Sequence, residues 1–277
     1  MIHGIMAPLW NSNSTDTSPL SPAGASGIGL ACALGLAKED CIVALWDVSR
    51  GVDDAATKIA AELDVRTHAL QVDVRDSKAV ESAVRQTEAT LGPIAHVVHA
   101  AAIGSGKFGF SFTNLDPSDW PRVLEVNILG TLHVAQATAA GMIARKAGTF
   151  VFIASVAGQI GSQTDPPYSA SKAANINFAQ CLAKDLAPHN IRVNTVNPSM
   201  VRTPLNQAAW TAWNDQQSPG KRRSYDDWAN EKIRAVAPLA RWQETADIAD
   251  MVTLLSSARA NQVTGQTTNV DSGQVMH

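Results

Sequence analysis

The sequence has few cysteines, little net charge and no long apolar run. Its 277 residues contain three cysteines, Cys32, Cys41 and Cys181, which are scattered, odd in number and without metal-ligand spacing. They favour small buried residues in a reducing compartment over a disulfide framework or a zinc site, so no metal site is predicted. The net charge of -3 argues against a nucleic-acid-binding protein, which normally carries a basic face.

The sequence also shows no segment that would direct it to a membrane. No apolar run approaches the roughly 20 residues needed to span a bilayer. Residues 1–10 are mildly apolar but lack the basic start and the long apolar stretch of a signal peptide. We therefore expect no membrane partner and a cytoplasmic location.

Short β-rich runs alternate with longer helical patterns from residue 40 onward. The runs predict strands over 41–46, 67–72, 94–100, 149–154, 191–196 and 267–270. The helical patterns cover 53–63, 77–91, 119–144, 168–186 and 245–256, with a break expected near Pro121. This alternation predicts an α/β fold with a mostly parallel sheet and helices on both faces. Without an internal repeat or a linker, residues 1–277 are expected to form one domain.

Tyr168 and Lys172 lie four residues apart in a predicted helix, so their side chains project from the same face. An ordinary tyrosine has a pKa of about 10 and is a poor base at neutral pH. A lysine cation fixed beside it would stabilise the phenolate and lower the pKa of the phenol. Ser155 would hydrogen-bond a substrate oxygen, and Tyr168 would exchange a proton with that oxygen. Alone the pair is a weak signal, because this spacing arises by chance in many helices.

The glycine-rich residues 24–29 precede a helical pattern over 30–37 and suit a phosphate-binding turn. Backbone N–H groups at such a helix start can bind a pyrophosphate. The candidate contacts are Gly24, Ser26, Gly27, Ile28 and Gly29.

Asp47 ends the next predicted strand, some 20 residues beyond the turn, where a carboxylate can accept hydrogen bonds from ribose hydroxyls and repel a 2′-phosphate. This position favours NAD over NADP as the cofactor. Nearby Arg50 weakens the preference, and a loop acid or helix cap is the alternative role of Asp47.

With these motifs the sequence resembles the short-chain dehydrogenase/reductase family over roughly residues 23–277. The resemblance implies a Rossmann-type, doubly wound sheet, a dinucleotide cofactor, and a catalytic set of Asn127, Ser155, Tyr168 and Lys172. In that family the lysine also holds the nicotinamide ribose, and the asparagine holds a water molecule of a proton relay. The further cofactor contacts implied are Asp73 and Val74 at the adenine, Ala100 and Ala101 after the fourth strand, and Pro198, Val201 and Thr203 at the carboxamide.

Some segments depart from the family pattern. Pro22-Ala23 stands where the family has Thr-Gly, which leaves Gly24 as the candidate replacement for the missing glycine. After the fourth strand, residues 99–102 read His-Ala-Ala-Ala in place of Asn-Asn-Ala-Gly. Ser199 replaces the glycine that commonly follows Pro198.

The segment before the turn departs furthest. Residues 15–22 do not have a strand pattern, and Pro19 and Pro22 argue against a regular central strand, since proline cannot donate to the ladder. We therefore expect an atypical first strand. Residues 1–9 are one candidate substitute, and a chain start altered relative to a working ancestor is the other explanation.

Residues 205–238 separate the carboxamide segment from the next family segment, and the resemblance implies a mobile flap over the substrate. Trp210 and Trp213 are candidates for the wall of an apolar pocket, with ordinary helix packing as the alternative. The basic run over 221–223 favours a solvated turn over an anion site. Gln159 and Pro166, between the serine and the tyrosine, are further candidate substrate contacts besides Ser155.

The sequence thus predicts an NAD(H)-dependent oxidoreductase that interconverts a small secondary alcohol and a ketone by hydride transfer. The character of the flap favours a polyol or diol by analogy. One alternative is a 3-oxoacyl-type reductase, and others are a catalytically silent dinucleotide-binding regulator or scaffold and a chain with a disrupted cofactor site. The resemblance also implies a homodimer or homotetramer, assembled through the helices of Asn127 and Tyr168 and the C-terminal strand.

Overall fold

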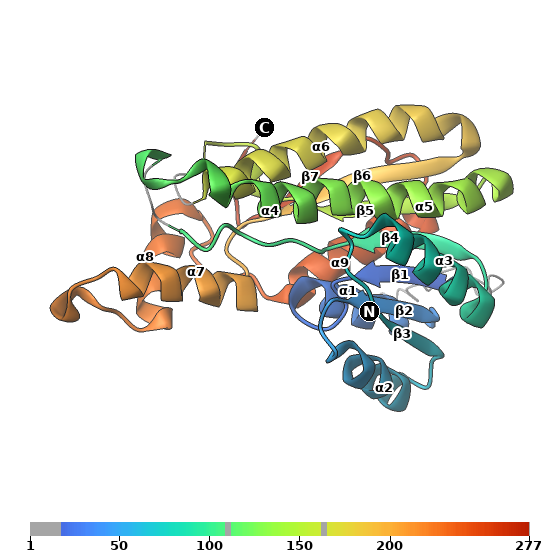
Figure 1. The fold of residues 1–277 in the computed structure, drawn as a ribbon, viewed down its shortest axis with the longest axis horizontal. Coiled ribbons are helices and arrows are strands. Elements are labelled where there is room, and N and C mark those ends of the chain that lie inside the picture. Colours follow the sequence, from blue (N-terminus) through green and yellow to red (C-terminus); the bar gives the residue numbers. More distant parts are fainter. Residues whose placement is uncertain (1–17, 109–111, 162–164, 277) are drawn as a thin grey trace, which may run out of the picture.

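Seven parallel strands form one sheet in the computed structural model, which describes residues 18–108, 112–161 and 165–276 (Figure 1). The strands lie in the order β3-β2-β1-β4-β5-β6-β7. This order reverses between β1 and β4, which is the doubly wound Rossmann-type arrangement, with a crevice at the carboxyl ends of the strands. The predicted fold class is confirmed. The strands are β1 (Ser18–Pro22), β2 (Val43–Asp47), β3 (Thr67–Gln71), β4 (Ile94–His99), β5 (Gly148–Ile153), β6 (Ile191–Pro198) and β7 (Thr267–Val270).

Helices cover both faces of the sheet (Figure 1). One face carries α3 (Ser77–Leu91), α5 (Gly130–Arg145) and α6 (Pro166–Leu186), which bury apolar side chains against the strands. The other face carries α1 (Gly27–Ala37) packed on α9 (Thr245–Ser256), with α2 (Val52–Leu63) beside α1. Burial on both faces explains why strands such as β5 are almost entirely apolar.

The helix predicted over 119–144 is a continuous helical run that changes type along its length. A short turn, η2 (Pro117–Asp119), leads into α4 (Pro121–Leu124), a π-helical turn, η3 (Glu125–Leu129), and α5. Pro121 lies in the first turn of α4, where its missing N–H has no intrahelical partner to lose, so it starts the helix.

This helical run also corrects the expectation that no apolar segment approaches membrane-spanning length. By length and composition alone, Pro117–Arg145 could cross a membrane. In the fold, however, α5 buries Val134, Ala135 and Met142 in the core between the sheet and α3. It therefore occupies the place of a core helix.

Residues 18–22 form the central strand although their sequence pattern argued against one, and the strand is irregular at Pro19, as expected for an atypical first strand. β1 lies in the middle of the sheet, paired with β2 on one side and β4 on the other. Pro19 lies at a register irregularity opposite β4, and Pro22 is the last residue of the strand, with its carbonyl accepting the Ala100 N–H at 3.3 Å. A bulge and a strand end are positions that tolerate a missing donor, and Leu20 between them is fully buried. Residues 1–9, the candidate substitute, lie outside the described residues.

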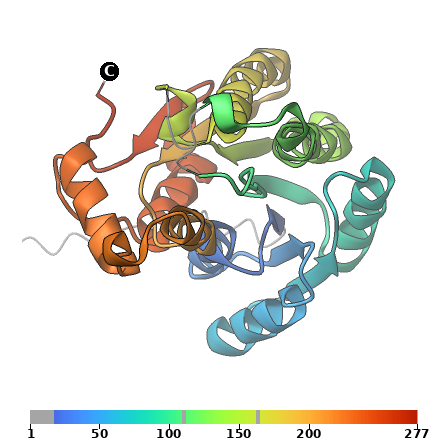
Figure 2. The same cartoon turned by 60° about the vertical axis from the view of Figure 1, so that its left-hand side comes forward.

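Two further helices extend beyond the carboxyl ends of the strands and form the segment predicted as a flap (Figure 2). They are α7 (Pro204–Asp215) and α8 (Tyr225–Val236), joined through η6 (Pro219–Lys221). Aromatic contacts hold them together: the rings of Trp213 and Trp228 are 6.2 Å apart, and those of Trp210 and Tyr225 are 5.8 Å apart. The Tyr225 hydroxyl donates to the Asn206 side-chain oxygen at 2.9 Å, which ties α8 to α7.

Candidate active site

A cavity of about 660 Å³ lies where the carboxyl ends of the strands meet the flap. Its wall combines the start of α1, the segments after β4, β5 and β6, the first turns of α6, and parts of α7 and α8. A cavity of this size with a few convergent polar groups is typical of a small-molecule site. The predicted residues that line it are Ser26, Gly27, Ile28, Gly29, Ala100, Ser155, Tyr168, Lys172, Pro198, Val201, Thr203 and Trp213.

Ser155 and Tyr168 meet in this wall from two different elements. Ser155 follows β5 and caps the short turn η4 (Val156–Gly158): its hydroxyl oxygen accepts the Ala157 N–H at 3.1 Å. Tyr168 lies in the first turn of α6, which the buried Asp165 side chain caps. Burial raises the pKa of Tyr168 to about 12, although a hydrogen bond with Ser155 acts in the opposite direction. The phenol is therefore protonated at neutral pH.

Lys172 lies one turn further along α6, with its ammonium nitrogen 5.4 Å from the centre of the Tyr168 ring. The same nitrogen donates to the Ile153 carbonyl at 2.7 Å and is almost completely buried. Burial lowers the pKa of Lys172 to about 7. In the protein without cofactor the pKa of Tyr168 lies above its ordinary value, because burial disfavours the charged form of the phenol. A lowering by Lys172 together with a cationic nicotinamide ring stays a prediction.

Asn127 does not line the cavity. It lies fully buried in the π-helical turn, where its amide nitrogen donates to the Ile103 carbonyl and the Ser171 hydroxyl, both at 2.9 Å. Its side-chain oxygen accepts the Ile103 N–H at 2.9 Å, and its backbone carbonyl accepts from Asn175 at 2.9 Å. Asn127 thus joins the segment after β4 to the helix that carries Tyr168 and Lys172. π-Helical turns of this kind are frequent at functional sites.

The turn between β1 and α1 approaches the helix very closely. A Cβ at Gly29 would lie 2.1 Å from the Ala23 carbonyl oxygen, so only glycine fits there. Gly27 has a φ of 57°, in the left-handed region that favours glycine. Ser26 starts α1 without a side-chain cap, and it lines the cavity together with Gly27 and Ile28. The start of a helix with its backbone exposed to a cavity suits the pyrophosphate of a dinucleotide.

The predicted substitution of Gly24 for the missing family glycine is not what the turn shows. Ala23 itself adopts the left-handed conformation, with a φ of 70°. Gly24 is buried behind the turn, where its N–H donates to the Trp46 carbonyl at 2.9 Å and an added Cβ would lie 2.8 Å from that of Leu45. Gly24 therefore packs the turn onto β2 and does not line the cavity.

Asp47 lies at the end of β2 and contacts the same turn. Its carboxylate accepts the Ala25 N–H at 3.1 Å and the Ser49 N–H at 2.8 Å. It does not line the cavity. Its place beside the phosphate turn is nonetheless where the adenosine ribose of a dinucleotide is expected in this type of sheet.

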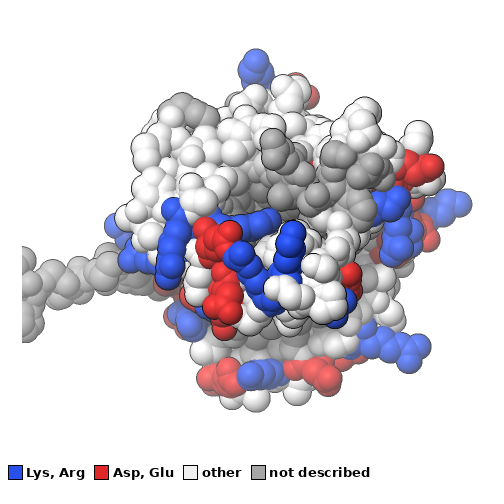
Figure 3. Space-filling model, turned by 90° about the vertical axis from the view of Figure 1, so that its left-hand side faces the viewer, with Lys and Arg blue, Asp and Glu red and all other residues white. Residues whose placement is uncertain are grey.

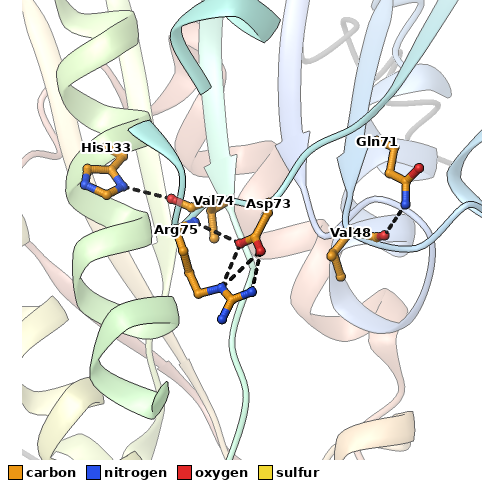
Figure 4. Close-up of polar contacts among 6 residues, drawn as sticks. All are labelled: Val48, Gln71, Asp73, Val74, Arg75 and His133. Carbon is orange, nitrogen blue, oxygen red and sulfur yellow. Dashed lines mark hydrogen bonds and ion pairs between the residues drawn. The ribbon is translucent and has the colours of Figure 1, made fainter. Parts of the chain in front are cut away.

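The residues predicted to contact adenine lie further along the same edge (Figure 4). The Arg75 guanidinium donates to the Asp73 carboxylate at 2.6 Å, and this hydrogen bond lowers the pKa of Asp73. The Val74 carbonyl oxygen is 2.9 Å from Nδ1 of His133, and on the other side of Asp73 in the view the Gln71 amide donates to the Val48 carbonyl at 2.8 Å (Figure 4). Asp73, Val74 and Ala101 are outside the cavity wall.

Three of the predicted substrate contacts are also outside it. Gln159 follows η4 and Pro166 starts α6, but neither lines the cavity. Trp210 turns to the connection between α7 and α8, where its indole N–H donates to the Arg223 carbonyl at 3.2 Å and its ring packs edge-on against Tyr225. Of the two flap tryptophans predicted to contact the substrate, Trp210 and Trp213, only Trp213 lines the cavity.

The cavity wall also contains residues that the sequence analysis did not predict. They come from the loops after β4 and β6, from the flap and from the end of the chain. One signal was available: Trp228 and Lys232 are four residues apart on a helix and so share a face. The unpredicted polar and large apolar members are Phe108, Met200, Asn206, Trp228, Lys232 and Gln274.

Comparison with known proteins places these residues in a family context. The family model described as enoyl-(acyl carrier protein) reductase matches residues 23–274. The 3-oxoacyl-[acyl-carrier-protein] reductase FabG of Thermotoga maritima is 30% identical over 252 residues, covering 91% of this chain and 95% of its own length. The NAD-dependent glycerol dehydrogenase of Listeria innocua is 29% identical over 261 residues, covering 94% of each chain.

Solved structures of oxidoreductases also match this chain over nearly its whole length. NAD⁺-bound xylitol dehydrogenase matches with a TM-score of 0.85 and 26% identity, over 95% of this chain and all of its own. L-Sorbose reductase of Gluconobacter frateurii, complexed with NADPH and L-sorbose, matches with a TM-score of 0.87 over 98% of this chain and all of its own. L-Sorbose reductase is 24% identical to this chain, so the similarity to it shows a shared fold alone.

Proposed function

The chain belongs to the short-chain dehydrogenase/reductase family of NAD(P)-dependent oxidoreductases acting on CH–OH groups, and from that premise we propose that it interconverts a small secondary alcohol and a ketone with NAD(H). The observation that carries the proposal is the meeting of Ser155, Tyr168 and Lys172 in one wall of a cavity that also contains the start of α1. A proton-transfer group and a dinucleotide-binding turn thus face the same space.

The cofactor, when bound, supplies or accepts the hydride. The start of α1 would hold its pyrophosphate, and Lys172 with the segment 198–203 would hold its nicotinamide half. Ser155 would orient the substrate oxygen through its hydroxyl. Tyr168 would give its proton to that oxygen during reduction, for which a protonated phenol with a pKa of about 12 is the competent form. Lys172 would stabilise the phenolate left behind.

Asp47 supports NAD as the cofactor in preference to NADP. Its carboxylate lies against the phosphate turn, where it would accept hydrogen bonds from the ribose and repel a 2′-phosphate. Replacing Asp47 with asparagine removes the charge and keeps the shape. We expect the ratio of the dissociation constants for NADPH and NADH to fall at least tenfold, while the same change at the exposed Asp53 leaves the ratio unchanged.

A polyol or diol is the substrate class that we favour. The support is the similarity to a glycerol dehydrogenase and to a xylitol dehydrogenase, both named for NAD. A 3-oxoacyl thioester is the second candidate, favoured by the FabG relative. Steady-state rates with glycerol, xylitol, 2,3-butanediol and acetoacetyl thioesters, followed at the absorbance of NADH and NADPH, separate the two. A chain that reduces the thioester far better than it oxidises any diol would refute the first choice.

The acid–base role of Tyr168 has a matched control within the chain, which contains only one other tyrosine, Tyr225. Tyr168→Phe should lower kcat by at least a hundredfold and leave the dissociation constant for NADH within about threefold, because it removes a single hydroxyl. Tyr225→Phe should keep turnover within about tenfold of the original. A Tyr168→Phe variant with more than a few per cent of the original activity would exclude the assignment.

Assembly and location are proposals of the same kind. We expect a symmetric dimer or tetramer through the helices that carry Asn127 and Tyr168, where Leu129 and Leu132 are exposed. Light scattering of the original chain and of Leu132→Glu tests this, since a buried charge would dissociate the assembly. A cytoplasmic location fits three unpaired cysteines, and cell fractionation tests it.

A further inference from the structure

The flap side of the cavity contains a buried hydrogen-bond donor without an acceptor. Trp228 lines the cavity and is 5% exposed, and within the described part of the chain its indole nitrogen has no hydrogen-bond partner. A buried indole N–H usually finds a partner, because leaving it unpaired costs about 1–3 kcal/mol. The indole nitrogen has almost no accessible surface, so this unpaired donor lies within the cavity wall and not at its surface.

Lys232 adds a positive charge to the same part of the wall. It lies one turn beyond Trp228 on α8, with its ammonium nitrogen 4.5 Å from the centre of the Trp228 ring, and it lines the cavity. Burial lowers the pKa of Lys232, which shows that its surroundings supply little compensating negative charge. No acidic side chain among the described residues forms an ion pair with it.

The neighbouring basic residues on the outer surface differ from Lys232 in this respect. Figure 3 shows the end of the molecule formed by α7 and α8, where Lys and Arg side chains lie among Asp and Glu. Arg223 pairs with Glu231, and Arg202 pairs with Asp226 at 3.1 Å. Lys232 faces the cavity and lacks such a partner, so its charge is available to a ligand.

Two amide side chains in the wall also leave their donor groups for a ligand. The Asn206 side-chain oxygen accepts from the Tyr225 hydroxyl, and among the described residues its nitrogen contacts only the Met200 sulfur, a weak acceptor, at 3.7 Å. The Gln274 side-chain oxygen is taken by the Ser199 hydroxyl. The flap side of the cavity thus presents an ammonium group and amide nitrogens, beside a buried indole N–H.

We propose that the substrate carries an anionic oxygen group, a carboxylate or a phosphate, which binds at the ammonium group of Lys232, beside Trp228, while its alcohol or ketone lies at Ser155 and Tyr168. The inference rests on the proposed oxidoreductase function and narrows its substrate to a hydroxy or keto acid, or to a phosphorylated polyol. An all-donor set with one cation is complementary to such a group, because charge-assisted hydrogen bonds are about twice as strong as neutral ones. A neutral polyol would leave the ammonium group of Lys232 without a counter-charge.

The test compares substrates that differ only in the anion. D-Gluconate and D-sorbitol 6-phosphate are compared with D-sorbitol, and 3-hydroxybutyrate with 1,3-butanediol, using the original chain, Lys232→Met and Trp228→Phe. Arg234→Met is the control, because Arg234 is an exposed cation on the same helix. Lys232→Met should raise KM for the anionic substrates at least tenfold, change kcat little, and affect the neutral partners less than threefold. Trp228→Phe should have a smaller effect in the same direction, and Arg234→Met none.

A second readout keeps the inference separate from the proposed function. Quenching of tryptophan fluorescence measures the binding of the same compounds whether or not they react. If no compound is oxidised but the anions bind and Lys232→Met abolishes their binding, the oxidoreductase assignment to these substrates fails and the anion site stands. Equal effects of Lys232→Met on acids and neutral partners would overturn the anion site. The anion site would also be overturned if Lys232→Met weakened the binding of NADH and not that of the anions, since that result would assign Lys232 to the cofactor pyrophosphate.

Discussion

Replacing Gly29 with alanine tests how closely the phosphate turn and α1 must approach. A Cβ at this position would lie 2.1 Å from the Ala23 carbonyl oxygen, a distance that must grow to at least 3.0 Å. A backbone shift of that kind in a packed region costs about 1–3 kcal/mol. It also moves the Gly29 carbonyl away from the Ser21 hydroxyl, now 3.0 Å away, and losing a buried hydrogen bond costs about 1–3 kcal/mol. We therefore expect a loss of about 2–6 kcal/mol from the free energy of unfolding.

Urea unfolding followed by tryptophan fluorescence measures this loss, and titration with NADH measures the effect on the cofactor site. Gly35→Ala is the control on the same helix, because its Cβ would meet the Thr253 hydroxyl at 3.1 Å and the Ala249 Cβ at 3.4 Å. A small rearrangement there is offset by the better helix propensity of alanine, by about 1 kcal/mol. Gly29→Ala should bind NADH at least tenfold more weakly than Gly35→Ala. Equal stability and equal NADH affinity in the two variants would refute the close-approach reasoning.

Further predictions concern the same turn and the two buried titratable groups of the site. Ala23→Gly should stabilise the fold by up to about 1 kcal/mol in urea unfolding, because a left-handed φ of 70° is strained for alanine but not for glycine. A less stable variant would contradict this expectation. Alcohol oxidation should accelerate from pH 7 to pH 10 while carbonyl reduction stays nearly level. The reason is that burial raises the pKa of Tyr168 to about 12 and only oxidation needs the phenolate. Matching pH–rate profiles in both directions would exclude the acid–base role of Tyr168. Lys172→Met should be more stable than the original chain, and the gain in the free energy of unfolding should be largest below pH 7. The gain should shrink as the pH rises from 7 towards 10.5. Over that range the lysine of the unfolded chain stays protonated, while the buried one, with a pKa of about 7, does not. A difference in unfolding free energy that does not vary with pH would show that the ammonium group is not destabilised by burial.

The strands and helices of the second half were predictable because their patterns are strong and local. The run over 149–154 is apolar enough to require burial on both faces, and residues 191–194 alternate apolar and polar side chains with the two-residue period of a strand. The central strand β1 escaped prediction because Pro19 and Pro22 dominate its local pattern. The sheet overrides that pattern by placing Leu20 in the core and the two prolines at a register irregularity and at the strand end.

Within the candidate site, the chemical roles of the side chains could be predicted better than the places that these side chains take in the fold. Ser155, Tyr168 and Lys172 were chosen for what their side chains can do at a given spacing, and they meet in the cavity wall. The raised pKa of Tyr168 in the protein without cofactor could not be predicted, because burial is a property of the tertiary structure. Trp210 and Trp213 read alike in sequence, yet the fold turns only Trp213 to the cavity.

The sequence by itself determined the order of strands and helices, the glycines of the phosphate turn and the spacing of Tyr168 and Lys172 on one helix face. These are local properties, set by the periodicity of side chains and by backbone freedom. Only the tertiary structure decided that Ala23 takes the left-handed position, that Asn127 joins elements outside the cavity, and that Lys232 and Trp228 enter it. Those outcomes depend on which distant segments pack together, and the flap that brings α8 to the catalytic wall is held by contacts that no local pattern specifies.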